Sequence, residues 1–204
     1  MGRLTRPNPR GSIDRSSMDD MAPPLLEPTV RDWSLMPLDA LASIFVSLGA
    51  VEVLMGAGLV CRSWLEAAKL PDVWRAVDIQ NHEVVFEKDD FVLCAMAKAA
   101  VDRSDGQLRV FAGMSFVTDE LLQYIFERSP SLTTLRLTWC DVFRTRPINV
   151  IRECPLLEVL GLHDCFQIND DGERALREKF ARIKNLTIEW HECNDYGNYD
   201  CECC

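Results

Sequence analysis

The sequence predicts a mixed fold, in which a small segment of three short helices precedes an α/β array with one parallel sheet. Apolar residues first recur at helical intervals, over residues 37–70. Downstream, the pattern L-x-x-L-x-L-x-x-C occurs at residues 132–140 and again at residues 157–165, an offset of 25 residues. Helical patterns lie between and after these copies. A strand and a helix that recur at this period are typical of a solenoid.

The composition fits a reducing compartment, and we expect the cytoplasm, the nucleus or both. The net charge of −10 gives the chain no electrostatic reason to bind nucleic acid. No apolar run approaches the ~20 residues of a bilayer span, so no membrane partner is expected. Nine cysteines would fit a secreted disulfide scaffold, but the Arg- and Pro-rich start lacks the apolar stretch of a signal peptide. Five cysteines lie instead inside apolar patterns, where a reduced thiol packs as a small apolar group: Cys61, Cys94, Cys140, Cys154 and Cys165.

Residues 1–30 are expected to be disordered, because they are rich in Pro, Arg, Ser and Asp and hold few large apolar groups. An organellar transit peptide is the alternative for such an Arg- and Ser-rich start. Asp14, Asp19 and Asp20 count against it, since transit peptides are poor in acidic residues.

Residues 31–79 predict three short helices and a strand. The first helix follows Pro37 and stops at Gly49, with apolar residues at helical spacing between them. A weaker helix covers residues 50–58, a third covers residues 59–70, and Pro71 ends it. The two-residue period of residues 74–79 then indicates a strand. Three helices in about 45 residues cannot bury all of these apolar groups, so we expect a second polypeptide to cover the surplus.

Residues 80–190 predict the repeats, with about four strands. Besides the two clear copies, a downstream copy has Ile183, Leu186 and Ile188, with His191 in the cysteine slot. An upstream copy has Leu108 and Val110, with Gly113 in that slot. We expect the side chain in the slot to cap backbone amides at a turn. Helices are predicted over residues 91–101, 118–129 with Thr118 as the N-cap, 146–154, and 170–183.

These segments resemble a known family. Residues 33–79 are similar to an F-box, on Met36-Pro37, Ile44-Phe45, Val60-Cys61-Arg62 and Pro71-Asp72-Val73-Trp74. The repeats resemble the cysteine-containing leucine-rich repeats that commonly follow an F-box, and the whole resembles plant-type F-box/leucine-rich-repeat proteins. This resemblance implies a short leucine-rich-repeat solenoid with parallel strands on its concave side. It also implies docking to the Skp-type adaptor and cullin of an SCF ubiquitin ligase.

The resemblance assigns two candidate surfaces. Adaptor binding is expected at Met36, Pro37, Leu41, Ile44, Leu48, Val60, Cys61 and Trp64. The alternative is that these residues are the core of a private helical bundle, and for Phe45 and Trp74 both interpretations stay open. Target binding is expected on the concave face, at Arg109, Phe111, Arg136, Thr138, Trp139, His163, Glu189 and Trp190. Packing at the sheet edge is the alternative for both tryptophans, and a solvated face is the alternative for the two arginines, which we expect to stack in one column.

The tail, residues 191–204, offers soft metal ligands at His191, Cys193, Cys201, Cys203 and Cys204. Its Cys-x-Cys-Cys ending lacks the paired ligands of a zinc site, so we expect an oxidation-prone acidic tail and no metal or cofactor. No catalytic elbow, paired carboxylates or phosphate loop is evident, and the chain is not expected to be an enzyme.

We therefore expect the substrate receptor of an SCF ligase, which holds an unidentified target protein for ubiquitination and degradation. One alternative is a leucine-rich-repeat scaffold that acts without a ligase. Another is an enzyme with a Cys/His site in the tail.

Overall fold

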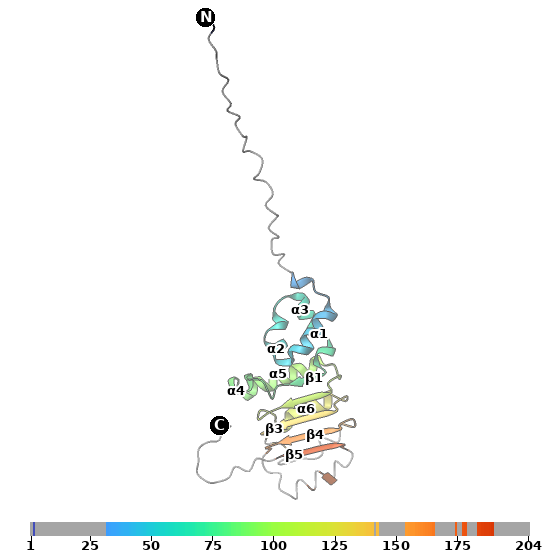
Figure 1. Ribbon diagram of the computed structural model, residues 1–204. Helices are drawn as coiled ribbons and strands as arrows, with labels where there is room; N and C mark the ends of the chain where they lie inside the picture. Colours follow the sequence, from blue (N-terminus) through green and yellow to red (C-terminus); the bar gives the residue numbers. More distant parts are fainter. Residues whose placement is uncertain are drawn as a thin grey trace, which may run out of the picture. The chain divides into compact units, whose positions relative to one another are not determined.

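The computed structural model describes Gly2, residues 32–140, Val142, residues 154–165, Arg174, residues 177–178 and residues 183–189 (Figure 1). The chain divides into two units, Met1–Asp32 and Trp33–Cys204, and all described helices and strands lie in the second. Several predictions fall outside the described residues: the disorder of residues 1–30, the tail 191–204, Trp190, and most of the helices at 146–154 and 170–183.

The first part of the second unit is a helical module. The predicted first helix is confirmed as α1, and Gly49, with φ of +94°, lets the chain turn directly into α2. The second and third helices are shorter than predicted, so that Leu59 and Val60 lie in a tight turn before α3. The elements are η1 (Trp33–Leu35), α1 (Leu38–Leu48), α2 (Ala50–Met55), η2 (Ala57–Leu59), α3 (Arg62–Ala67) and η3 (Pro71–Trp74).

A five-stranded parallel sheet follows, with its strands paired in chain order (Figure 1). The strand predicted at residues 74–79 is confirmed over Ala76–Asp78 as β1, while Trp74 belongs to η3. β1 pairs with β2, and α2 contacts it from the helical module. The predicted mixture of helices and a parallel sheet is therefore confirmed. The strands are β1 (Ala76–Asp78), β2 (Val110–Gly113), β3 (Thr134–Thr138), β4 (Val159–His163) and β5 (Asn185–Glu189).

The described residues between these strands include three complete helices: α4 (Val84–Glu87), α5 (Asp90–Arg103) and α6 (Asp119–Arg128). The Thr118 hydroxyl accepts a hydrogen bond from the Leu121 N–H at 3.3 Å, which confirms the predicted N-cap of α6. Helices α5 and α6 contact each other, and they share one apolar core with the inward side chains of the strands. The sheet therefore has one covered face.

The leucines of the repeat form the inward columns of the sheet. Leu135 pairs with Leu160 and Leu160 with Leu186, so the predicted alignment of the last three strands is confirmed. The predicted upstream copy is wrong by three residues, because Leu135 pairs with Phe111 rather than Leu108. A Cβ at Gly113 would lie 2.5 Å from Val117 Cγ2 and 3.0 Å from the Phe111 ring, so glycine replaces leucine where these neighbours already fill the space.

The cysteine slot is buried against the backbone. Cys140 and Cys165 are both buried, and their thiols donate to backbone carbonyl oxygens. Cys140 Sγ lies 3.3 Å from the oxygen of Met114, on the loop that follows the preceding strand. A neutral thiol is a weak donor, and here it adds a second hydrogen bond to a carbonyl oxygen that also accepts from the Val117 N–H at 2.9 Å. The slot thus joins neighbouring repeats below the surface.

Candidate functional site

The first candidate surface is a stripe along α1. Pro37, Leu41, Ile44 and Leu48 recur at intervals of four, three and four residues, which places them on one side of the helix. Pro37, Ile44 and Leu48 are exposed, and Leu48 keeps 46% of its surface accessible. Leu41 is fully buried in the core. Its prediction as an adaptor-binding residue is therefore wrong, because the side chain faces the other helices of the module.

The turn into α3 adds a second exposed apolar segment. Val60, predicted for docking, is 61% exposed, whereas Cys61 is half-buried with its Sγ 3.2 Å from Ser63 Oγ. Helix α3 contacts both α1 and η2, so the turn and the stripe belong to neighbouring elements. An apolar group that remains exposed on a folded module is a candidate contact for another protein.

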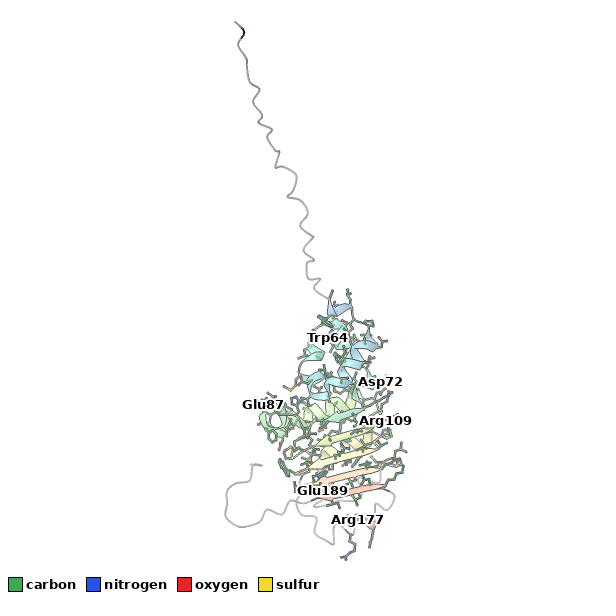
Figure 2. The ribbon with its side chains drawn as sticks, viewed as in Figure 1. Trp64, Asp72, Glu87, Arg109, Arg177 and Glu189 are labelled. Carbon is green, nitrogen blue, oxygen red and sulfur yellow. The ribbon has the colours of Figure 1, made fainter. Side chains whose placement is uncertain are left out.

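Trp64 has an internal role, and Figure 2 shows it within the helical module. Its ring meets Phe45 edge-on at 5.5 Å between centroids, and its Nε1 donates to the Trp33 carbonyl oxygen at 3.2 Å. The side chain is half-buried, as is Met36, and both pack against the core. Trp64 therefore ties η1 and α1 to α3, and only part of its surface is left for a partner.

Phe45 and Trp74, for which two interpretations were open, are both fully buried. Trp74 Nε1 donates to the Ala68 carbonyl oxygen at 2.9 Å, and the Arg103 guanidinium lies 5.1 Å from the centre of the Trp74 ring. These contacts join η3 to α3 and α5, so both residues are core residues.

Sequence reasoning missed several exposed apolar residues. In the helical module these are Trp33, Leu35, Leu38, Val46, Met55 and Leu59. Phe86 at 75% and Phe91 at 85% form a separate pair, on α4 and the start of α5. For the first group, the sequence did offer a signal of exposure: a segment of about 45 residues holds more apolar side chains than it can bury. Glu87, Asp89 and Asp90 next to the phenylalanines were a signal for solvent exposure of the second.

The second candidate surface is the outward face of the sheet. Its rows follow the strand register, and the residues of one row lie side by side. One row crosses all five strands and consists of Asp78, Ala112, Arg136, Gly161 and Thr187. The next row, nearer the carboxyl ends of the strands, crosses β3 to β5 and consists of Thr138, His163 and Glu189.

Two predicted target-binding residues do not belong to these rows. Phe111 is fully buried, because it pairs with Leu135 in the inward column, so its assignment to the outward face is wrong. Arg109 precedes β2 and does not stack on Arg136, whose neighbour in that strand is Ala112. Arg109 is exposed, and Figure 2 places it far from Glu189 of β5. Arg109 and Arg136 therefore do not form the single column that was predicted.

Thr138, Trp139, His163 and Glu189, also predicted for target binding, lie where β3 to β5 end. His163 Nδ1 lies 3.0 Å from Glu189 Oε2, and Thr138 is the neighbour of His163 in the row. Trp139 has a φ of +53° and is half-buried against the core, with its Nε1 donating to Asp164 Oδ2 at 3.2 Å. These contacts favour the packing interpretation for much of the Trp139 ring.

No catalytic constellation forms among the described residues. They hold no group of three His, Cys, Asp or Glu side chains arranged for a metal ion. His82 and His163 each pair with one glutamate, Glu52 at 3.1 Å and Glu189 at 3.0 Å. The hydrogen bond with Cys165, together with burial, raises the pKa of Cys140 far above its usual range, so this thiol stays neutral.

Helix length gives one further observation. Within the described part of the chain, no single helix is long and apolar enough to cross a membrane. Among the described helices, α1 and the Ala50–Leu59 segment reach that length and composition together, but they are bent by 119°.

The helical module defines the class of protein. Residues 33–80 match the F-box-like family, and they span η1 to β1, including every exposed apolar residue of the module. The chain therefore carries an F-box-like domain, followed by a parallel sheet.

Curated relatives from Arabidopsis thaliana extend this assignment to most of the chain. The putative F-box/LRR-repeat protein 23 is 33% identical over 88% of this chain and 40% of its own length. F-box protein SKIP19 is 30% identical over 81% and 63%, and the putative F-box/LRR-repeat protein 22 is 31% identical over 82% and 55%. The chain is thus related to the plant F-box/leucine-rich-repeat proteins, as the sequence resemblance predicted, and it spans about two fifths to two thirds of these relatives.

Proposed function

We propose that the chain is the substrate receptor of an SCF-type ubiquitin ligase. In this proposal the F-box-like module docks on a Skp-type adaptor, which links it to a cullin, and the sheet is a short leucine-rich-repeat solenoid that binds the target. The protein acts by geometry, because it holds the target near a separate conjugating enzyme and raises the effective concentration of the reacting groups. It needs no nucleophile or cofactor of its own.

The observation that carries the proposal is the apolar surface of the module. Ile44, Leu48 and Val60 remain exposed although the surrounding helices are packed and Leu41, Phe45 and Trp74 are buried. Water-exposed apolar groups on neighbouring elements supply the anchors that dominate protein interfaces. Their position inside the segment that matches the F-box-like family supports a Skp-type adaptor as the partner.

The cellular setting follows from the same proposal. The cytoplasm or nucleus would keep thiols reduced, and the five described cysteines carry no disulfide. The alternative of a scaffold without a ligase uses the sheet in the same way but requires no adaptor.

Affinity purification from plant cells under proteasome inhibition separates these two functions. The ligase function predicts recovery of a Skp-type adaptor and a cullin together with target proteins. Recovery of targets without either ligase component would support the scaffold and contradict the ligase. Direct mixing of purified chain and adaptor, followed by size-exclusion chromatography, tests the first contact alone.

A further inference from the structure

Arg136 differs from the other charged residues on the outward face. Asp78 accepts a hydrogen bond from Asn81 Nδ2 at 3.2 Å, and Glu189 pairs with His163. Arg136 is exposed, and within the described residues its guanidinium makes no ion pair or hydrogen bond. Among the charged side chains in the described strand rows, Arg136 is therefore the one whose hydrogen-bonding groups are free to bind a ligand.

The residues on both sides of Arg136 are small and buried, whereas Arg136 itself is exposed. Ala112 is its neighbour on β2 and Gly161 its neighbour on β4. A Cβ added to Gly161 would lie 3.6 Å from Arg136 Cγ and 3.4 Å from His163 Nε2. The stem of Arg136 and the ring of His163 thus border the backbone of Gly161 from two sides. Gly161 itself is buried, so these side chains cover its backbone, and a ligand group can reach the exposed guanidinium at the outer end of the Arg136 stem.

The hydrogen bond of His163 fixes which part of its ring faces this place. An ionised Glu189 carboxylate can only accept, so Nδ1 carries the proton that it donates. Nε2 is then directed away from Glu189 and toward Gly161. The Glu189 carboxylate accepts from this ring, and no ion pair between Glu189 and Arg136 is present among the described residues.

We propose that an anionic side chain of the target binds Arg136 above Gly161, beside His163. This inference rests on the proposed target-binding function of the sheet and names the chemistry of the target segment, which carries a carboxylate or a phosphate at this point. A guanidinium offers two parallel N–H donors to such a group, and the pairing is stronger than a neutral hydrogen bond. The chain's net charge of −10 would by itself favour a basic target, so the proposed preference for an anionic group applies only to this row of the sheet.

Fluorescence polarisation with labelled peptides tests the inference. Three peptides share one apolar extended sequence and carry at the centre paired glutamates, a phosphoserine or paired lysines. We expect the full chain to bind one or both anionic peptides, and Arg136→Gln to weaken that binding about ten- to a hundredfold. Arg109→Gln, which removes an exposed arginine outside the row, should leave it unchanged. The stronger of the two anionic peptides distinguishes carboxylate from phosphate recognition.

Two variants of the floor residue test the position of the site. Gly161→Ala should bind normally, because its Cβ would make only ordinary contacts, whereas Gly161→Leu should block the approach to Arg136. Circular dichroism must show both variants folded. Preference for the lysine peptide, absence of binding by both anionic peptides, or equal losses in Arg136→Gln and Arg109→Gln would overturn the inference. Adaptor binding by the same proteins reports separately on the ligase function, so either proposal can fail alone.

Discussion

Replacing Leu48 and Val60 with serine should detach the F-box-like module from the proposed Skp-type adaptor without unfolding it. Leu48 is 46% exposed and Val60 is 61% exposed, so together they offer about one whole side chain that a partner could still bury. Full burial of such a side chain stabilises by about 1.5–3 kcal/mol. An adaptor that covers both residues should therefore bind the double variant roughly ten- to a hundredfold more weakly. Isothermal titration calorimetry with a purified Skp-type adaptor measures this difference.

Two variants of α1 act as controls. Val46→Ser removes a side chain that is 57% exposed on the same helix, but about 200° around the helix axis from Ile44. It should leave the dissociation constant unchanged. Leu41→Ala empties a fully buried position and should lower the free energy of unfolding by about 2–5 kcal/mol, which a thermal melt detects. Equal losses of affinity in Val46→Ser and in the double variant, or no loss in the double variant, would refute the proposed docking surface.

Three further changes test the packing of the fold. Trp74→Ala should lower the free energy of unfolding by about 3–5 kcal/mol in urea titrations, because the ring is fully buried and joins η3 to α3 and α5; a loss below 1 kcal/mol would contradict this role. Gly113→Ala should cost about 1–3 kcal/mol, since its Cβ would overlap Val117, and an unchanged melting temperature would show that the site has room. Phe86→Ser with Phe91→Ser should reduce the fluorescence of a bound apolar dye while the melting temperature stays constant, and a large drop in melting temperature would mean that the two rings are structural.

Local sequence signals placed the elements well where several of them coincided. α1 follows Pro37 and stops at Gly49, and α6 starts after its cap Thr118, so these boundaries could be predicted. The second and third helices have no such caps. Their ends depend on packing, including the approach of Gly58, where an added Cβ would lie 2.9 Å from the Val53 carbonyl oxygen. This packing left Leu59 and Val60 outside α3, which periodicity alone could not show.

The repeat could be aligned only where its leucines are present. β3, β4 and β5 carry leucine or isoleucine in both inward positions, and their register was predicted correctly. In β2 the same positions hold Phe111 and Gly113, a large and a small residue that compensate each other in volume. A search for the leucine pattern therefore finds no match at these two positions and aligns Leu108 instead. This shift is the reason that Phe111 was wrongly predicted on the outward face.

Candidate site residues were harder to predict, because spacing identifies a helix face but not its depth. Leu41 and Leu48 lie on one side of α1, seven residues apart, yet only Leu41 is buried. The difference depends on which neighbouring helix covers each turn, and that is a property of the whole module. The placement of Arg136 and His163 on either side of Gly161 likewise depends on the register of neighbouring strands, which no single segment of the sequence shows.

Because the strands pair strictly in chain order, positions across the outward face are evenly spaced. Each strand adds about 4.8 Å, so β1 to β5 provide a width of roughly 19 Å, which about six residues of extended peptide can cross. A substitution in one strand changes the surface at that strand and leaves the surface of the preceding strands unchanged. If the sheet binds targets as proposed, selectivity could change between related chains one strand at a time, while the F-box-like module stays the same.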